Sequence, residues 1–363
     1  MAARSETLSR IGRVLLLSSA LAVVAACGAA TVTPVLPAST PEVAASSSTA
    51  SSVPSCACTF GAAAAATTAA SAGAIGTPRP GRSGTVMAWG DDSSGQTEVP
   101  SGLTGVVAVA AGGDFSMALK SDGSVVAWGG TGNPTEVQVP AAATGVKAIA
   151  AGSSFAIALK SDGTVIGWGD NTSGQTAPPA TVKNVVEIAA AGSFAFALKS
   201  DGTVVAWGDD SNGQADIPAG LKNVTHVSAG YDFGVASLSD GTVLAWGDKY
   251  PTDVATHVTK VPSDLTGVSI VSAGFSHILA LKSDGTIAAW GGNQSGETTI
   301  PSGLHAAAIA AGGNFSLALK SDGTVVAWGG NDSGQTTLPS GLSNVIAIDA
   351  GGSHTLAVVS SGT

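Results

Sequence analysis

The chain has 363 residues, of which 44% are apolar and only 11% charged, and it contains 49 glycines and 7 tryptophans. This composition excludes a coiled coil and a disordered acidic chain. The net charge is −10, and all five arginines lie in the first 82 residues, so residues 83–363 carry 10 lysines against 23 acidic residues. So acidic a domain is a poor partner for phosphate backbones, and we expect no nucleic-acid binding.

The first 26 residues have the layout of an export signal. Arg4, Arg10 and Arg13 precede an apolar run, residues 14–26, that is too short for a permanent membrane helix. Residues 24–27, Val-Ala-Ala-Cys, resemble the lipobox of bacterial lipoproteins. The resemblance implies that Cys27 is acylated and anchors the mature chain to a membrane outside the cytoplasm. The alternative is an ordinary signal peptide cut nearby, which would leave the chain secreted.

Residues 27–82 are rich in Ala, Ser, Thr and Pro. Such a segment buries too little apolar surface to offset its chain entropy, so we expect a flexible tether. It contains Cys56 and Cys58, but no second Cys or His cluster completes a metal site. We expect a structural or incidental role for both cysteines, in a redox state that the sequence leaves open.

The remainder, residues 83–363, repeats a Trp-Gly pair seven times, in steps of 39, 40, 39, 39, 44 and 38 residues. A nearly fixed period of this length indicates a repeat fold in which each unit is buried against its neighbours. The pairs begin at Trp89, Trp128, Trp168, Trp207, Trp246, Trp290 and Trp328.

The unit at residues 106–140 predicts four short strands. Residues 106–111 form an apolar run, residues 115–120 alternate large and small side chains, and residues 125–128 end in Trp-Gly. Asp122-Gly123 between the second and third strands predicts a two-residue hairpin with positive φ at both positions. Residues 136–139 are expected to form a short fourth strand that ends at Pro140.

Four antiparallel strands in about 40 residues are typical of a β-propeller blade, so the sequence predicts an all-β, seven-bladed propeller. The domain opens at residues 83–89 with a third strand that lacks its first two, and it finishes at residues 350–363 with a strand that lacks its third. We therefore expect the terminal strands to pair and to close the ring.

The series Ala-Gly-x-x-Phe/His-x-x-Ala-Leu-Lys-Ser-Asp-Gly-Thr-Val-x-Ala-Trp-Gly, as in residues 151–169, resembles the regulator-of-chromosome-condensation repeat. The short period and the export signal resemble most closely the secreted bacterial β-lactamase-inhibitory proteins built on this repeat. The resemblance implies a seven-bladed propeller, and it transfers no activity by itself.

No catalytic, cofactor or metal constellation stands out, so we expect a non-enzymatic protein with no cofactor. His277 and His354 occupy the repeat position that other units fill with Phe, which favours packing over catalysis. The loop at Asp209-Asp210 resembles a calcium loop but lacks a closing bidentate Glu, so we expect a turn held by side-chain hydrogen bonds.

The direction of the strands sorts the loops onto two faces. The Ala-Gly loops after each first strand and the loops after each Trp-Gly share one face, which we call the loop face. The Ser-Asp-Gly hairpins and the linkers between units share the other, the hairpin face. The hairpin face is nearly uniform in sequence and is expected to be a solvated scaffold.

The irregular residues gather on the loop face. After Ala-Gly most units carry a small residue, but two adjacent units carry Tyr231 and Phe275, and an insertion, residues 248–261, lies between them in sequence. Aromatic residues rimmed by charge are typical of an interface hot spot. The alternative is that the two aromatic side chains simply cover the insertion. The candidate partner-binding residues are Asp209, Asp210, Tyr231, Asp232, Tyr250, His257, Phe275 and Ser276.

These observations predict a monomeric, surface-tethered module that binds an extracytoplasmic protein. The alternative is an inhibitor of a β-lactamase or a related penicillin-binding enzyme. The acidic loop residues Asp91, Asp92, Asp209 and Asp210 match that family, but the residue before each Phe/His position, aromatic in several of its repeats, is here small or polar. Acids without aromatic anchors contribute association rate more than affinity.

Overall fold

The computed structural model describes residues 82–132, 134–248 and 257–360. These belong to the second of two compact units, Ala63–Thr363, whereas the first, Met1–Ala62, lies outside the described residues. The export signal, Cys27, Cys56 and Cys58 therefore lie outside them as well. No helix among the described residues is long and apolar enough to cross a membrane.

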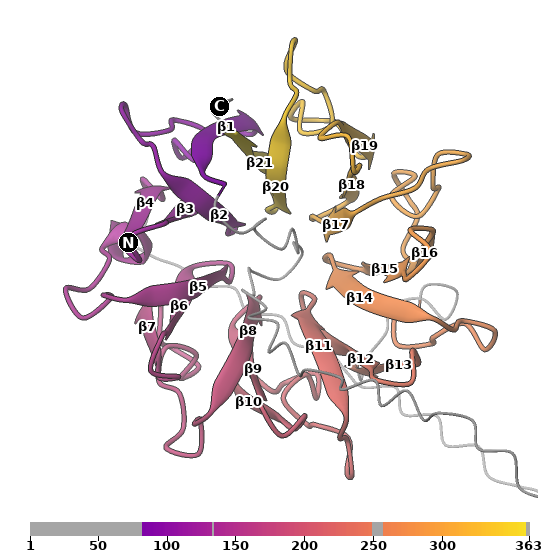
Figure 1. Cartoon of the computed structure of the whole chain (residues 1–363). Helices are drawn as coiled ribbons and strands as arrows, with labels where there is room; N and C mark the ends of the chain where they lie inside the picture. Colours follow the sequence, from indigo (N-terminus) through magenta and orange to yellow (C-terminus); the bar gives the residue numbers. More distant parts are fainter. Residues whose placement is uncertain (1–81, 133, 249–256, 361–363) are drawn as a thin grey trace, which may run out of the picture. The chain divides into compact units, whose positions relative to one another are not determined.

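The described chain is all β apart from one short 3-10 helix, η1 (Pro134–Val137). The strands form one six-stranded sheet, in the order β20-β21-β1-β2-β3-β4, and five sheets of three strands. Each three-stranded sheet is built from consecutive strands, and the sheets lie around a common centre with their first strands innermost (Figure 1). The strands are β1 Gly84–Gly90, β2 Val106–Ala111, β3 Phe115–Lys120, β4 Val125–Gly129, β5 Val146–Ala151, β6 Phe155–Lys160, β7 Val165–Gly169, β8 Val185–Ala191, β9 Phe194–Lys199, β10 Val204–Gly208, β11 Val224–Ala229, β12 Phe233–Leu238, β13 Val243–Gly247, β14 Val268–Ala273, β15 His277–Lys282, β16 Ile287–Gly291, β17 Ala308–Ala311, β18 Phe315–Leu319, β19 Val325–Gly329, β20 Val345–Ala350 and β21 His354–Ser360.

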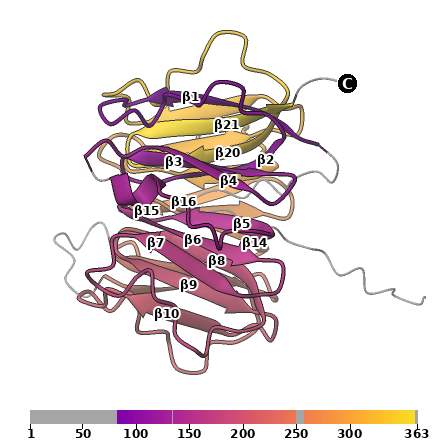
Figure 2. The same cartoon turned by 90° about the vertical axis from the view of Figure 1, so that its left-hand side faces the viewer.

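The hydrophobic core lies between neighbouring sheets, which pack one against the next (Figure 2). Inner strands are buried on both faces, as the continuous apolar run of β2 predicts. In one cluster, Phe115 and Met117 of β3 pack with Ile149 of β5 and Trp168 of β7. Each sheet therefore buries its faces only by having neighbours.

The fourth strand expected at residues 136–139 is not formed. The segment instead contains η1, Pro134–Val137, followed by tight turns. Its backbone groups bond locally, since Gln138 N–H donates to the Thr135 carbonyl and Val139 N–H to the Val137 carbonyl. A segment satisfied by its own turns offers no ladder to a neighbouring strand.

The Asp-Gly hairpins also differ from the prediction. Gly123 has a φ of +80°, but Asp122 is not among the residues with positive φ. Gly123 N–H donates to the Lys120 carbonyl, and Lys120 N–H donates to the Ser124 carbonyl. This is the three-residue loop in which a type I turn is followed by glycine in a bulge. Asp122 stabilises it by accepting hydrogen bonds from the Ser124 N–H and hydroxyl.

The Trp-Gly pairs end the third strands for a steric reason. All seven glycines have φ between +89° and +110°. A Cβ on Gly208, for example, would lie 2.5 Å from the Ser193 carbonyl oxygen, so no other residue fits without a shift. Each tryptophan before them donates its indole N–H to a backbone carbonyl of the preceding unit, at 2.8–3.0 Å.

The first and last described strands pair with each other. β1 and β21 form an antiparallel ladder from Gly84 opposite Ser360 to Gly90 opposite His354. β1 meets β2, its neighbour in sequence, only at Gly84 opposite Val106. β1 therefore completes a three-stranded group with β20 and β21, from the other end of the domain.

A leucine-to-alanine pair tests how firmly this terminal group is held. Leu356 of β21 and Leu279 of β15 occupy the same repeat position, and both are fully buried. We expect Leu356→Ala to lower the free energy of unfolding by about 2–5 kcal/mol, as a cavity in a packed core does, and Leu279→Ala to lower it by a similar amount. Urea unfolding measures both. A loss near zero for Leu356→Ala alone would show that the terminal strands do not share the core.

Candidate functional site

The loop face assembles as the strand directions predict. Backbone hydrogen bonds join the Ala-Gly loops to the loops after Trp-Gly, for example from Asp91 N–H to the Ser353 carbonyl and from Asp209 N–H to the Ser193 carbonyl. The hairpins join the linkers in the same way, as from Ser121 N–H to the Gly105 carbonyl. The predicted division of the loops into two faces is confirmed.

A small opening lies where the Ala-Gly loops of all the units meet. Its walls are the last alanine of each inner strand and the glycines that follow it. The glycines are required because a Cβ on Gly112 would lie 2.2 Å from the Phe115 ring. Backbone bonds link neighbouring loops around the opening, from Gly113 N–H to the Ser153 carbonyl and from Gly352 N–H to the Gly112 carbonyl.

Tyr231 and Phe275 lie together at this opening, which both of them line. Their ring centroids are 5.2 Å apart at an interplanar angle of 52°. The Phe275 ring also reaches within 3.7 Å of the position a Cβ would take on Gly313 and on Gly352. Tyr231 is 51% exposed and Phe275 44%, so both present apolar surface to solvent even though they contact each other.

A group of acidic residues is centred on Asp232, which directly follows Tyr231. Burial raises the pKa of Asp232, and repulsion from Asp248 and Asp209 raises it further. Burial also raises the pKa of Asp248, which nearby His257 partly offsets. The structure thus links Asp209, Asp232 and, through Asp248, His257 into one electrostatic group, in which Asp232 directly follows Tyr231 in the chain.

The other predicted residues have more local roles. Asp209 accepts hydrogen bonds from Ser211 and Gln214, and Asp210 accepts the N–H of Ala215. These bonds confirm the expected turn, and no metal-binding group of three or more His, Cys, Asp or Glu occurs among the described residues. Ser276 is half-buried next to Phe275, and its carbonyl accepts the N–H of Gly292. Tyr250 lies outside the described residues.

Two buried histidines form contacts that the sequence analysis missed. His354 and His277 are fully buried, which confirms packing positions. Nε2 of His354 lies 3.0 Å from Ser116 Oγ in the next unit, and Nε2 of His277 lies 3.0 Å from Ser316 Oγ. Both serines donate their hydroxyl protons to backbone carbonyls, so each histidine must donate from Nε2. Burial lowers the pKa of each imidazole to about 4.

A signal for these pairs was present in the repeat alignment. The units that follow His277 and His354 carry Ser316 and Ser116 directly after their Phe. The units that follow a Phe carry no serine there; they have Ala156, Ala195, Gly234, Ile278 and Thr355. The histidine and the serine therefore occur as matched pairs across neighbouring units.

Glu136 is a second buried group that the sequence analysis did not single out. Four other units place Gln at this position, and its Oε1 accepts the N–H two residues earlier, as Gln96 does from Ser94. Here the residue two positions earlier is Pro134, which has no N–H. Glu136 is 2% exposed, and its Oε2 has no hydrogen-bond partner. Burial, with repulsion from Asp114, raises the pKa of Glu136 to about 7.

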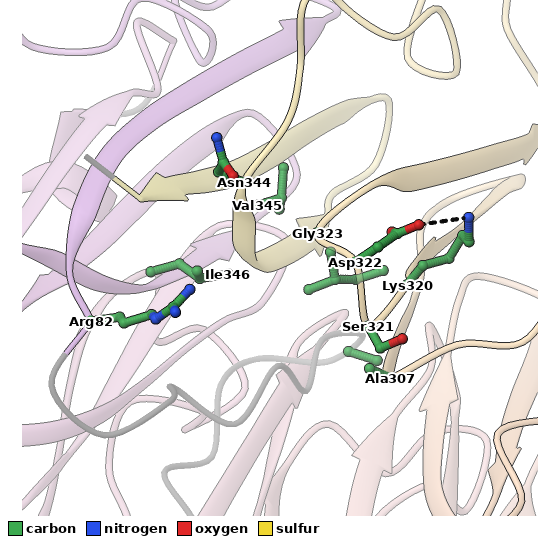
Figure 3. Close-up of a pocket in the computed structure, with 11 residues that line it drawn as sticks. Arg82, Ala307, Lys320, Ser321, Asp322, Gly323, Asn344, Val345 and Ile346 are labelled. Atoms are coloured by element: carbon green, nitrogen blue, oxygen red, sulfur yellow. Dashed lines mark hydrogen bonds and ion pairs between the residues drawn. The ribbon is translucent and has the colours of Figure 1, made fainter. Parts of the chain in front are cut away.

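The hairpin face is less uniform than its sequence suggests. A cavity of about 130 Å³ opens there between the starts of β17 and β20. Arg82 and Ile346 lie on one side of it, and Lys320, Ser321 and Ala307 lie on the other (Figure 3). The expectation of a plain scaffold surface is therefore corrected at this place.

Comparison with known proteins agrees with this geometry. The model of the regulator of chromosome condensation (RCC1) repeat matches six segments, residues 106–133, 146–175, 185–214, 224–249, 268–297 and 306–335. No curated protein sequence matches the chain.

Similar solved structures share the fold at low sequence identity. Prp20p from Saccharomyces cerevisiae aligns with a TM-score of 0.65 at 17% identity, over 77% of this chain and 92% of its own. Human WBSCR16 aligns with a TM-score of 0.60 at 16% identity, over 78% and 100%. The CRINKLY WD40 ectodomain of the Arabidopsis thaliana receptor kinase ACR4 aligns with a TM-score of 0.55 at 20% identity, over 70% and 91%.

The orphaned carboxyl of Glu136 predicts a pH-dependent stability difference. Between its ordinary pKa of 4.5 and about 7, the folded chain keeps a proton that the unfolded chain has released, so stability falls as the pH rises. Glu136→Gln removes the ionisable carboxyl. The free energy of unfolding that the variant gains over the wild type, measured with urea, should therefore be larger at pH 8 than at pH 5. The control is Glu297→Gln at the same repeat position, where Oε2 accepts the Ser295 N–H. An equal pH-dependent gain in the control would contradict the explanation.

The matched histidine and serine predict energetic coupling across the unit boundary. We expect His354→Phe and Ser116→Ala each to destabilise the protein, because each substitution leaves the other buried polar side chain without its partner or in poor steric fit with the new residue. The double variant restores the pairing seen at Phe115 and Ala156. Its loss in free energy of unfolding should therefore be smaller than the sum of the two single losses, with a coupling energy of about 0.5–3 kcal/mol. A double-mutant cycle by urea unfolding measures this, and simple additivity would refute it.

Proposed function

Because the chain belongs to the regulator of chromosome condensation (RCC1) repeat family, we propose that it is a non-catalytic module that binds a protein through its loop face. The observation that carries this proposal is the exposed aromatic pair Tyr231 and Phe275, which stands where the other units present small residues. Exposed aromatic side chains in the centre of a surface, rimmed by charge, are the usual anchors of protein interfaces.

The proposed architecture is a closed ring of seven blades. The ladder between β1 and β21 supports it, as does the bond from Gly352 N–H to the Gly112 carbonyl. Asp349 Oδ2 also accepts the N–H of Ala111, so the last inner strand contacts the first. Closure matters for function because it would hold the loops of the last and first units beside one another at the opening.

The flanking acids favour a partner with a basic rim. Asp232 directly follows Tyr231, and Asp209 and Asp248 lie close enough to Asp232 to repel its charge. A partner loop that combines an apolar tip with Lys or Arg would bury its apolar atoms on Tyr231 and Phe275 and pair its charge with the acids. Prp20p, which shares the fold, is described by its binding properties to Gsp1p and histones. A protein partner is the corresponding proposal here.

We place this partner outside the cytoplasm, with the module tethered through Cys27. The proposal rests on the lipobox-like Val-Ala-Ala-Cys and the basic, apolar order of residues 1–26. Nucleotide exchange on a cytoplasmic GTPase fits poorly with export. Inhibition of a β-lactamase is the second candidate, because it agrees with the acids on the loop face and with an extracytoplasmic target.

Paired substitutions test the loop face. We expect Tyr231→Ala combined with Phe275→Ala to weaken partner binding at least tenfold, since hot-spot truncations cost about 2 kcal/mol or more, without changing thermal stability. Binding is measured by titration against a class A β-lactamase and by capture of envelope proteins with immobilised protein. Leu338→Ala is the matched control, because Leu338 is also an exposed large apolar residue, at 37%. Binding unchanged by the double substitution would refute this site, and nanomolar β-lactamase inhibition would select the second candidate.

A further inference from the structure

We propose that the cavity between β17 and β20 on the hairpin face binds a small monocarboxylate with a short apolar tail, held through the guanidinium of Arg82. This site is on the opposite face from the aromatic pair and is independent of the proposed function.

The unit that supplies one wall of the cavity departs from the repeat in sequence. In six units the residue that opens the inner strand is a valine, and it is buried, as Val146 and Val345 are. In this unit the corresponding residue is Ala306, which is only half-buried, and β17 begins two residues later, at Ala308. The linker is also one residue shorter, because Pro301 precedes Ala306 by five positions, whereas Pro140 precedes Val146 by six. Because the inner strand of this unit starts late, Ala307 and Ala308, at its beginning, lie at the cavity wall.

The walls of the cavity are divided by chemistry. Ala307, Ala308, Leu319, Val345 and Ile346 supply apolar surface. The charged and polar groups come from Arg82, Lys320, Asp322 and Asn344. A ligand that fills this space must therefore have both an apolar part and a polar part.

The charge of the site matches one negative charge. Asp322 is already satisfied, since it accepts hydrogen bonds from Lys320 Nζ at 3.0 Å and from the Thr324 N–H and hydroxyl. Arg82 is the one arginine among the described residues, and it forms no ion pair or hydrogen bond with another described residue. The pairing of Lys320 with Asp322 leaves the guanidinium as the unmatched charge. A second negative charge on the ligand would be repelled by Asp322.

The geometry of a guanidinium favours a carboxylate. Its donors form a planar fork that bonds both oxygens of a carboxylate at once. The cavity is too small for a nucleotide or a lipid, and its apolar side offers no donors to the remaining oxygens of a phosphate. A short-chain monocarboxylate satisfies the charge, the planar fork and the apolar wall together.

The test is a calorimetric titration of the purified full-length chain at constant ionic strength. Acetate, butyrate and hexanoate serve as probes, with butyramide and inorganic phosphate as the comparison arms. We expect affinity to rise about fourfold per methylene until the cavity is full, and butyramide and phosphate to bind at least tenfold more weakly than butyrate. Equal binding of butyramide or phosphate, or no dependence on chain length, would overturn the proposal.

Two variants assign the site. Arg82→Gln should weaken butyrate binding at least tenfold, because a charge-assisted hydrogen-bond pair is lost. Ala307→Leu should fill the cavity and abolish the gain from butyrate to hexanoate. Both residues are exposed, and thermal unfolding checks that the fold is kept. Lys120→Gln is the matched control, because Lys120 pairs with Asp122 on the equivalent hairpin of a unit that has a buried valine. Unchanged binding in Arg82→Gln, or an equal loss in the control, would refute the assignment.

Discussion

The hydrogen bond from each tryptophan indole to a backbone carbonyl of the preceding unit is the interaction on which the other features depend. Six of the seven join residues 31 or 32 positions apart, and Trp89 reaches the Gln335 carbonyl across 246 positions. The bond fixes where the third strand ends and where the preceding loop must lie. Most variation in repeat length then falls outside the bonded segment, apart from the one residue fewer between Glu297 and Trp328. The longest step, 44 residues between Trp246 and Trp290, is absorbed before Val258, whose carbonyl Trp290 still reaches at a separation of 32.

Polar groups inside this framework are satisfied across unit boundaries rather than within units. His354 with Ser116 and Asp349 with Ala111 N–H both join neighbouring units. Ser228 and Ser272 accept N–H groups from the next inner strand in the same manner. A buried polar group costs free energy unless it is paired, so such positions can change only together with their neighbours. Three buried atoms of the described residues lack a partner: Nδ1 of His277, Nδ1 of His354 and Oε2 of Glu136. At Glu136, Pro134 removes the donor that other units supply, and the raised pKa of this carboxyl is the physical result.

Much of the unit could be predicted from one copy of the repeat. The strands expected at residues 106–111 and 115–120 coincide with β2 and β3, because an apolar run and an alternating run impose those conformations on their own. The prediction of a strand at residues 136–139 was wrong, since the apolar side chains of this segment contact the next unit and do not reflect strand pairing. Only the Gly of each Asp-Gly pair takes positive φ, which the dipeptide alone does not distinguish.

Part of the candidate site was predictable because the repeat shows which residue type to expect at each position. Tyr231 and Phe275 stand out as departures from a repeated small residue, and the structure brings them to 5.2 Å. The cavity at Arg82 was missed because it is lined by residues of two neighbouring units together with Arg82, which precedes the first repeat. Such features belong to the fit between units and not to any unit read alone.

The ladder between β1 and β21 has a consequence for the order in which the chain acquires its structure. A hairpin such as β3 and β4 closes a loop of a few residues, whereas β1 must find a partner some 270 positions away along the sequence. The entropy of loop closure grows with the logarithm of length, and distant contacts form slowly. During synthesis β1 leaves the ribosome before the other strands, and its edge stays unpaired until β21 has been made. The seam at β1 is therefore the place where a nascent chain is open to premature pairing with a second copy.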